Sequence, residues 1–312
     1  MIVTGQYTNS LFEEEWWLDA VAPQQWKAIE LKDNSGCVYA RFPYCEQRKF
    51  GKKVLGTPKL TQTLGIYIKD TGAKTAKRLS REKDILIEII KNLPNINQDF
   101  FLDSNNQYFM PFYWKRYKIS PAISYRINDL SDEKKIWAGF KENIKTDIKK
   151  AQKQLCVRDD LPIEELITIQ KKTFQRQNRK LPYDEELIRN IDKAANKRNQ
   201  RKFLCAVDDE NRIHAAAYFV FDERRCYYLI GGGDPELRNS GAGALLVWEG
   251  IKFAMTVSEV FDFEGSMIED IERFFRGFGG EPITYYHVTK YKGMLYLLYQ
   301  LKPFFKRILG YK

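Results

Sequence analysis

Three apolar runs lie close together in the second half of the chain, within residues 202–232. Short polar turns at residues 208–212 and 222–225 separate them. Runs joined by such turns are typical of hairpins, so we expect a meander of three antiparallel strands. Beyond a glycine-rich segment the pattern predicts a helix at 240–256, a strand at 259–266, a helix at 267–278 and a strand at 282–291.

A strand–helix–strand step within one sheet is expected to be parallel and right-handed. The meander followed by such a step therefore predicts a mixed, mostly antiparallel sheet flanked by helices. The glycine-rich segment falls at the carboxyl end of a strand, which is the edge where α/β sheets tend to bind ligands.

The first hundred residues combine short strands with helices. Alternation predicts strands at 37–44, 98–103 and 124–129, and an extended segment at 56–68. Helical spacing predicts helices at 10–22 and 81–93, the first with Ser10 as its N-cap.

The middle of the chain predicts a long helix at 131–155. Its apolar residues step by three and four and form a core stripe: Trp137, Phe140, Ile144, Ile148, Ala151 and Leu155. Its opposite face carries four lysines at steps of four: Lys141, Lys145, Lys149 and Lys153. This face is either solvated or directed at an anion. A second helix is expected at 162–176, and we place the domain boundary between the two, giving domains of 1–150 and 151–312.

Composition narrows the class of protein. The 312 residues carry a formal net charge of +10, which suits an anionic partner without naming one. Five cysteines without a C-x-x-C pair, and two histidines, argue against a zinc site or a disulfide framework. We expect no metal and a reducing, cytoplasmic location.

The two ends of the chain bear on the membrane. The N-terminus lacks the features of a signal peptide, and no apolar run approaches the length of a membrane span. Residues 291–312 are apolar and basic together, so they predict either a packed helix or a peripheral contact with a membrane surface.

The glycine-rich segment reads GGGDPELRNSGAGALLVWEGI and begins at Gly231. The expected helix that follows presents unpaired N–H groups at its first turn, which together with the helix dipole form an anion site. Glycines would let the backbone approach that anion, and Arg238 would neutralise its charge. A pyrophosphate fits best. The segment lacks both G-K-[ST] and G-x-G-x-x-G, so it is neither a P-loop nor a dinucleotide fingerprint.

The stretch from Arg238 to Gly243 is an R-x-x-G-x-G signature between a strand and a helix. Here the sequence resembles the GNAT acyltransferase superfamily, whose members bind the coenzyme A pyrophosphate on this turn. Residues 261–282 are similar to the late block of the Fem aminoacyltransferases of methicillin-resistance type and their acyl-CoA-using relatives. Residues 144–155 are similar to the basic helix that joins the two halves of that group.

The resemblance extends over nearly the whole chain and implies tandem GNAT-like domains. It implies an N-terminal domain on the acceptor side and a C-terminal domain on the acyl-donor side. It assigns the cofactor-binding turn to seven consecutive residues and to two residues of the preceding strand: Arg238, Asn239, Ser240, Gly241, Ala242, Gly243 and Ala244, with Leu229 and Gly231. A backbone N–H from residues 228–231 would polarise the thioester carbonyl.

Candidate catalytic groups follow the turn. Asp262 and Glu264 share one face of a strand and are candidates for the base, with Glu264 preferred; otherwise they cap a helix or pair with Arg273 and Arg276. Arg276 stands where the family usually has lysine, which leaves it a role in charge stabilisation.

The candidate proton donors to the thiolate are Tyr286 and its neighbours Tyr285 and His287. Four residues of the first half could line a cleft for the acceptor, but their residue types favour an ordinary place in the hydrophobic core: Trp16, Trp17, Gln62 and Tyr67.

These features and the resemblance predict a transferase that uses acyl-CoA as its donor. The resemblance implies that the acceptor is a small-molecule amine of a cell-envelope or polysaccharide precursor. The clean pyrophosphate signature favours coenzyme A as the donor. The alternatives are a Fem-type transferase that uses aminoacyl-tRNA, and a binding module without catalysis. DNA is not an expected partner.

Overall fold

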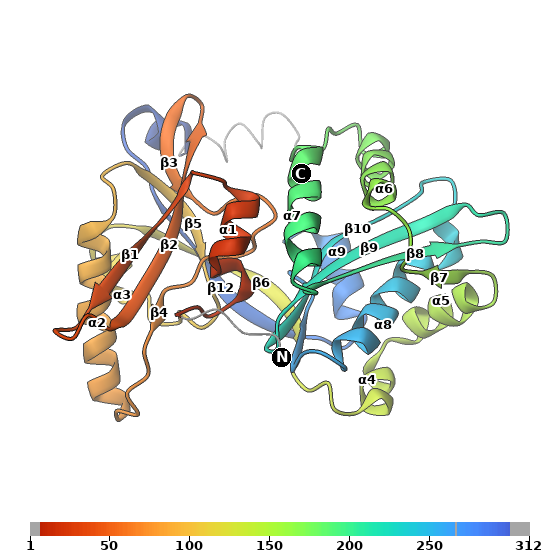
Figure 1. The fold of residues 1–312 in the computed structure, drawn as a ribbon, viewed down its shortest axis with the longest axis horizontal. Helices are drawn as coiled ribbons and strands as arrows, with labels where there is room; N and C mark the ends of the chain where they lie inside the picture. Colours follow the sequence, from red (N-terminus) through yellow and green to blue (C-terminus); the bar gives the residue numbers. More distant parts are fainter. Residues whose placement is uncertain (1–6, 266, 300–312) are drawn as a thin grey trace. The chain divides into compact units, whose positions relative to one another are not determined.

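The computed structural model describes residues 7–265 and 267–299 of the chain (Figure 1). The chain divides into two compact units, and it crosses between them more than once. Among the described residues, unit 1 comprises residues 123–265 and 267–284, and unit 2 comprises residues 7–122 and 285–299. This division differs from the boundary expected after residue 150.

Unit 1 is built on a mixed sheet with the strand order β6-β11-β10-β9-β8-β7. The strands are β6 (Lys118–Ile127), β7 (Cys156–Arg158), β8 (Arg201–Val207), β9 (Ile213–Phe221), β10 (Arg225–Gly233) and β11 (Val260–Asp262). The expected meander is confirmed as β8-β9-β10, and only the β10–β11 pair is parallel among these strands.

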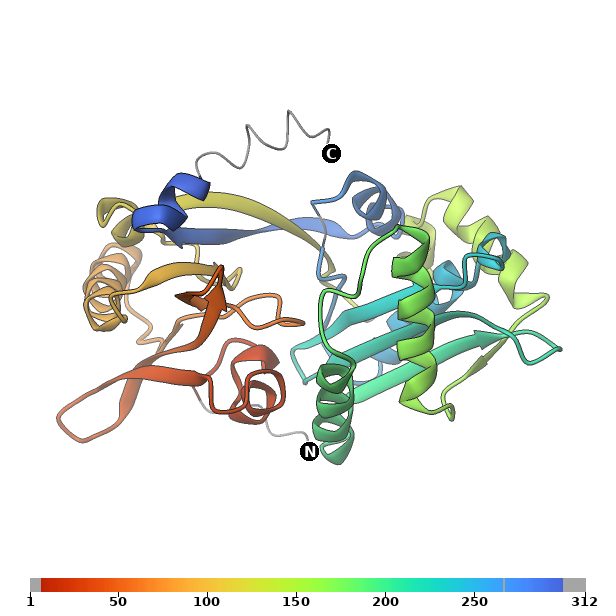
Figure 2. The same ribbon diagram turned by 90° about the horizontal axis from the view of Figure 1, so that it is seen from above.

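Helices cover both faces of the sheet of unit 1 (Figure 2). They are α4 (Glu133–Gly139), α5 (Glu142–Gln152), α6 (Ile163–Arg176), α7 (Glu185–Lys197), α8 (Ala242–Ala254) and α9 (Glu269–Arg276), with a short 3-10 helix η2 (Arg238–Ser240) before α8. In Figure 1, α6 and α7 lie on one side of the strands, and α5 and α8 lie on the other. The expected core stripe of α5 is confirmed, since Ile144, Ile148 and Ala151 pack into one buried cluster with α8 and Phe261.

In unit 2 the strands follow the order β1-β2-β3-β5-β12, with β4 paired to β2. Its strands are β1 (Trp26–Lys32), β2 (Val38–Lys49), β3 (Lys52–Gly56), β4 (Tyr67–Ile68), β5 (Asn97–Leu102) and β12 (Glu281–Lys290). Its helices are η1 (Leu11–Glu13), α1 (Glu15–Val21), α2 (Thr75–Asn92) and α3 (Met110–Trp114). Strands β3 and β5 are parallel, and α2 connects them.

The two halves of the chain repeat one topology and exchange their last strands. Each half runs through three antiparallel strands, a helix, a parallel strand, a short helix and a final strand. However, β6, the last strand of the first half, pairs with β11, and β12, the last strand of the second half, pairs with β5. This exchange is the physical reason why no single cut in the sequence separates the units.

The prediction of one long helix at 131–155 is wrong, because the structure has two helices there, α4 and α5, with a break between them. Phe140 is extended, with ψ near 144°, and its ring is buried. The Lys141 N–H donates to the Gly277 carbonyl at 2.8 Å, and a Cβ on Gly279 would lie 2.8 Å from the Gly139 carbonyl oxygen. The loop after α9 therefore occupies the space that a continuous helix would need.

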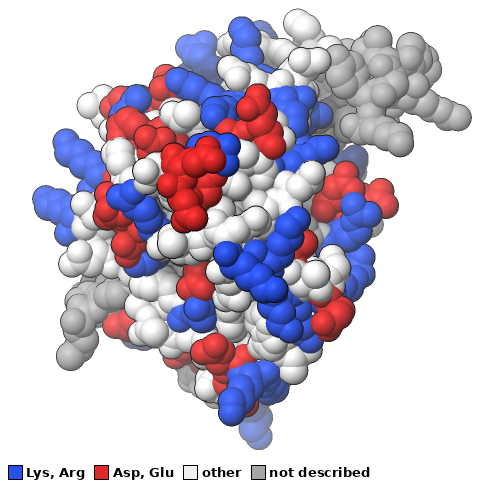
Figure 3. All heavy atoms as spheres, turned by 90° about the vertical axis from the view of Figure 1, so that its right-hand side faces the viewer, with Lys and Arg blue, Asp and Glu red and all other residues white. Residues whose placement is uncertain are grey.

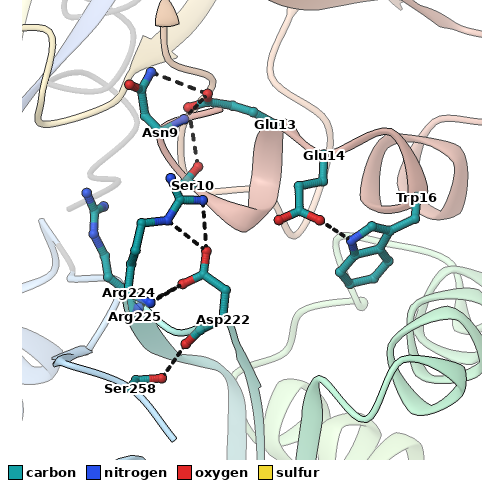
Figure 4. Close-up of polar contacts among 9 residues, drawn as sticks. All are labelled: Asn9, Ser10, Glu13, Glu14, Trp16, Asp222, Arg224, Arg225 and Ser258. Carbon is teal, nitrogen blue, oxygen red and sulfur yellow. Dashed lines mark hydrogen bonds and ion pairs between the residues drawn. The ribbon is translucent and has the colours of Figure 1, made fainter. Parts of the chain in front are cut away.

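Polar contacts fix two tight segments, one in each unit (Figure 4). At the β9–β10 turn, the buried Asp222 carboxylate accepts the backbone N–H of Arg225 at 2.8 Å and the Arg224 guanidinium at 3.0 Å. In unit 2, Ser10 precedes the 3-10 helix η1 and makes no side-chain cap bond, contrary to expectation. Its hydroxyl instead lies 3.3 Å from Glu13.

Within residues 7–265 and 267–299, no helix combines the length and the apolar character that crossing a bilayer requires.

Candidate active site

Strands β10 and β11 diverge near the middle of the unit 1 sheet. They pair over three residues, the last pair being Tyr227 with Asp262, and β10 then continues to Gly233. The pairing of β10 with β9 shifts register between Tyr228 and Ile230, so that Leu229 has no residue opposite it. A bulge re-aims the backbone groups of its extra residue. The shift falls within residues 228–231, where a carbonyl-binding N–H was expected.

Four of the five glycines within residues 231–243 are close to other parts of the protein. A Cβ on Gly231 would overlap the Tyr228 ring, and one on Gly241 would overlap the Asp147 carbonyl of α5. A Cβ on Gly232 would lie 2.7 Å from the Thr173 hydroxyl, and one on Gly233 would lie 3.3 Å from the His214 carbonyl oxygen. Packing within the chain therefore accounts for these four glycines without an anion.

Gly243 is the exception. It lies in the first turn of α8, is exposed, and a Cβ placed on it would meet nothing within 4 Å. The first bond of this helix runs from the Leu245 N–H to the Gly241 carbonyl, so the amides of Gly243 and Ala244 precede the helical hydrogen-bond ladder. An anion could reach this open turn.

Helix α5 holds the turn in place. The Lys150 ammonium donates to the Asn239 carbonyl at 2.6 Å, and the Gln154 amide donates to the Ser240 carbonyl at 3.2 Å. Gly241 adopts φ near +80° and packs against Asp147. Arg238 is exposed at the start of the turn.

Glu264 lies just beyond β11 and has three unusual properties. Its φ is near +57°, which is uncommon for a residue with a side chain. Its Oε1 is buried without a hydrogen-bond partner among the described residues. Burial, together with the neighbouring Asp262 carboxylate, raises the pKa of Glu264 well above its usual value. Strained backbone and an unsatisfied buried carboxyl cluster at functional sites.

Glu264 and Leu229 are placed symmetrically. Each lies two residues beyond the last pair of the diverging strands, Tyr227 with Asp262. A carboxyl with a raised pKa and a re-aimed backbone N–H therefore follow the same point of divergence. A raised pKa suits a base that must accept a proton near neutral pH.

The comparisons with known proteins fit this geometry. Residues 138–266 match the family model described as an acetyltransferase (GNAT) domain. These residues form a GNAT domain. The matched region extends from the end of α4 to just beyond Glu264, so it includes the diverging strands and the glycine-rich turn. The match supports a transferase.

Solved structures show that the GNAT domain is part of a larger, similar fold. FemX aligns with a TM-score of 0.65 at 13% identity, over 94% of this chain and 94% of that chain. A tandem GNAT protein from the clavulanic acid biosynthesis pathway aligns with a TM-score of 0.51 at 11% identity, over 86% and 83%. The C-terminal domain of a putative lysylphosphatidylglycerol synthetase from Agrobacterium fabrum aligns with a TM-score of 0.52 at 9% identity, over 88% and 90%.

These likenesses show the fold, and they confirm the expected tandem GNAT-like architecture. No curated protein sequence matches the chain at a significant level.

Asp262 of the GNAT domain is fully buried and already engaged. It accepts the Arg126 guanidinium at 2.6 Å, the Ser124 hydroxyl, and the backbone N–H of Glu264 at 2.9 Å. The expected partners Arg273 and Arg276 bind elsewhere, to Asp270 and Glu272. Asp262 therefore ties β6 to β11 and positions Glu264.

The other catalytic candidates have different partners. Arg276 is half-exposed on α9, where Glu272 binds it at 2.8 Å. Tyr286 belongs to unit 2, where it is paired with Leu102 of β5 and its ring contacts Phe109. Trp17 is a fully buried core residue of unit 2, and its indole N–H donates a hydrogen bond to the Thr61 hydroxyl at 2.9 Å. The interpretation of Trp17 as ordinary core agrees with this position.

Tyr228 is a side chain that the sequence interpretation missed. Its ring folds over Gly231 and contacts Phe219 and Phe275, and burial raises the pKa of its hydroxyl to about 12. The sequence offered one signal, an aromatic residue three positions before the glycines. Its hydroxyl lies over the backbone of Gly231, close to the bulge.

The corresponding edge in unit 2 is occupied by its own chain. Beyond the parallel β3–β5 pairs, the Phe101 carbonyl accepts the Leu64 N–H at 2.8 Å, and the Phe101 N–H donates to Thr57 at 3.0 Å. Residues 57–65 therefore satisfy backbone groups that a ligand would otherwise meet. Of the two repeated topologies, the GNAT domain of unit 1 keeps the open turn.

Helix α5 presents a basic face beside this turn. Lys149, Lys150 and Lys153 are exposed, whereas Lys145 is only partly so. Figure 3 shows a band of Lys and Arg side chains on this side of unit 1, near an acidic group. The band is suited to attract an anionic ligand.

Proposed function

We propose that the chain is an N-acyltransferase that moves an acyl group from acyl-CoA to an amine of a cell-envelope or polysaccharide precursor. The observation that carries the proposal is the placement of Leu229 and Glu264, each two residues beyond the last pair of the diverging strands, in the unit that also has the open first turn of α8. The donor pyrophosphate would lie on the amides of Gly243 and Ala244, with Arg238 nearby.

In the proposed reaction each group has one task. The Leu229 N–H donates to the thioester carbonyl, whose oxygen gains charge as the amine attacks its carbon. The C–N bond forms and the C–S bond breaks. Glu264 accepts the proton that the amine loses, and the Tyr228 hydroxyl donates to the departing thiolate. Asp262 positions Glu264. The charge-stabilising role expected of Arg276 and the proton-donor role expected of Tyr286 stay predictions.

Two observations support the class of acceptor and the compartment. One similar structure is named for lysylphosphatidylglycerol and another is a FemX, which favours a cell-envelope acceptor over other amines. All five cysteines are unpaired thiols, which suits the reducing cytoplasm where acyl-CoA is available.

A second donor, aminoacyl-tRNA, is favoured by the basic face of α5. Nucleic-acid binding through such a face would weaken steeply with salt. Binding of acyl-CoA through a few backbone amides would depend on salt far less.

The test uses Gly243→Val, because a Cβ at this position meets nothing within 4 Å. It should weaken acetyl-CoA binding by tenfold or more, since one charge-assisted hydrogen bond contributes ~1.5–3 kcal/mol. Calorimetric titration of the wild type and the variant, with acetyl-CoA and with charged tRNA, measures the affinity for each donor. Gly139→Val is the matched control, because a Cβ there is also unobstructed. Gly241→Val is unsuitable, because its side chain would collide with α5.

Equal acetyl-CoA affinity in Gly243→Val, Gly139→Val and the wild type would remove the turn from the donor site. Tight binding of charged tRNA and none of acetyl-CoA would establish the second donor. Binding that depends on Gly243, with no product from any amine offered, would identify a binding module.

A further inference from the structure

Exposed hydrophobic side chains are concentrated in two segments of unit 2. Among the described residues, six of the ten exposed large hydrophobics belong to these segments: Tyr113, Trp114, Met294, Tyr296, Leu297 and Leu298. Trp114 is 50% exposed at the end of α3, and Leu297 is 60% exposed in the helical turn after β12. Soluble surfaces rarely gather so many apolar side chains without a partner.

Contacts between cations and their neighbours join the two segments. The Lys290 ammonium donates to the Lys115 carbonyl at 2.8 Å and lies 4.6 Å from the centre of the Tyr117 ring. The Lys118 ammonium lies 5.0 Å from the centre of the Tyr299 ring. These contacts bring the cations of the two segments close to one another. We call residues 113–118 and 290–298 together the aromatic–basic surface.

The aromatic–basic surface has no carboxylate of its own. Residues 107–128 and 282–312 contain neither Asp nor Glu. The nearby Asp99 carboxylate is already bound by His287, Tyr291 and Lys49. The two segments therefore carry positive charge without a compensating carboxylate of their own.

Exposed apolar, aromatic and basic side chains together favour a membrane over RNA or a second copy of the chain as the partner. Exposed Leu and Met side chains enter acyl chains, Trp and Tyr lie at the level of lipid head groups, and Lys and Arg bind anionic head groups. RNA would use the cations and aromatics but leave the aliphatic side chains in water. A symmetric dimer through this surface would bring like charges together.

We propose that the aromatic–basic surface docks the protein on an anionic phospholipid membrane without spanning it. The proposal rests on unit 2 alone and does not depend on which donor unit 1 uses.

The test is flotation of the full chain with vesicles of phosphatidylcholine alone or mixed with phosphatidylglycerol. The wild type should bind the mixed vesicles and lose binding as salt rises. Lys115→Gln with Arg116→Gln should weaken binding about fivefold for each charge removed. Trp114→Ser with Leu297→Ser should weaken it at any salt concentration.

The β2–β3 turn of the same unit provides matched controls. Phe50 is 84% exposed, and Lys52 and Lys53 are exposed beside it. Phe50→Ser, and Lys52→Gln with Lys53→Gln, should leave vesicle binding unchanged. Circular dichroism checks that every variant is folded.

Failure of the wild type to bind mixed vesicles, or equal losses in the surface and control variants, would overturn the proposal. So would variants of the aromatic–basic surface that abolish self-association or tRNA binding while vesicle binding persists. None of these results bears on acetyl-CoA binding, so the proposed function is tested separately.

Discussion

Glu264 is held in a conformation that its neighbours impose. Its positive φ costs about 1–3 kcal/mol for a residue with a side chain. Its N–H is fixed by Asp262, and Gly265, also at positive φ, passes so close to Ile123 and Ser124 that a Cβ would overlap them. The structure thus maintains a strained carboxyl that contributes nothing evident to stability, which is the pattern expected of a functional group.

We expect Glu264→Gln to lower kcat by about 10²–10⁴-fold and to change donor affinity little, because the amide cannot accept the proton of the amine. Steady-state kinetics with acetyl-CoA and the best amine acceptor measures both quantities. Glu223→Gln removes an exposed carboxylate of the same unit and is the control. Wild-type kcat in Glu264→Gln would exclude Glu264 as the base.

The raised pKa of Glu264 also predicts how stability depends on pH. In the unfolded chain this carboxyl titrates near 4.5, whereas burial holds its proton to higher pH in the folded chain. Above pH 4.5 the unfolded state therefore binds fewer protons, and the free energy of unfolding falls as pH rises toward the folded pKa.

Glu264→Gln removes this penalty, so it should be more stable than the wild type at neutral pH. The difference should shrink as pH falls toward 4.5. Urea unfolding at a series of pH values measures it. A difference that stays constant with pH would show that the pKa is not raised by folding.

The sequence pointed to Asp262 and Glu264 as a pair but could not separate their roles. Their spacing predicted a shared face, and nothing local distinguishes them. The distinction comes from Arg126, which lies 136 residues before Asp262 in the chain and neutralises only that carboxylate. A partner so distant leaves no trace in the local pattern.

At the level of elements, the periodic segments were predictable and their interruptions were not. The meander, α6 and α8 follow directly from apolar spacing and polar turns. The α4–α5 break does not, because the stripe from Trp137 to Leu155 keeps its helical phase across it. The loop after α9 imposes the break, through Gly277 and Gly279.

Gly279→Ala should therefore destabilise the fold more than the same substitution at another glycine with positive φ and no close neighbour. Gly72 has a similar φ, near +64° against +72°, but a Cβ there meets nothing within 4 Å. Gly72→Ala should cost about 1–2 kcal/mol for the left-handed backbone alone. Gly279→Ala should cost at least ~1 kcal/mol more, because its Cβ would press on Gly139. Equal midpoints in denaturant would mean that the contact with Gly139 carries no energy.

For the whole molecule, the sequence supported two similar halves but not their exchanged strands. The local patterns of β6 and β12 are those of ordinary strands and do not specify their partners. Pairing with β11 and β5 is decided by contacts between residues far apart in the sequence, such as Arg126 with Asp262 and His287 with Asp99. The expected boundary after residue 150 followed chain order, whereas the units follow strand pairing.

Fragments 1–150 and 151–312 should consequently fail to fold as independent domains. The first lacks β12, the neighbour of β5, and the second lacks both β6 and α5, on which α8 packs. Each should show reduced secondary structure by circular dichroism and no cooperative thermal transition. A sharp transition in either fragment would show that the exchanged strand is dispensable to it.

The pairing of β12 with β5 also sets an order of events during translation. Residues 97–102 leave the ribosome long before residues 286–290, which cover one edge of that strand. Throughout the synthesis of unit 1, the nascent chain carries β5 with this edge open, and an open edge invites pairing with other chains. Chaperone demand during synthesis should accordingly be set by how quickly the ribosome reaches the second half of the message.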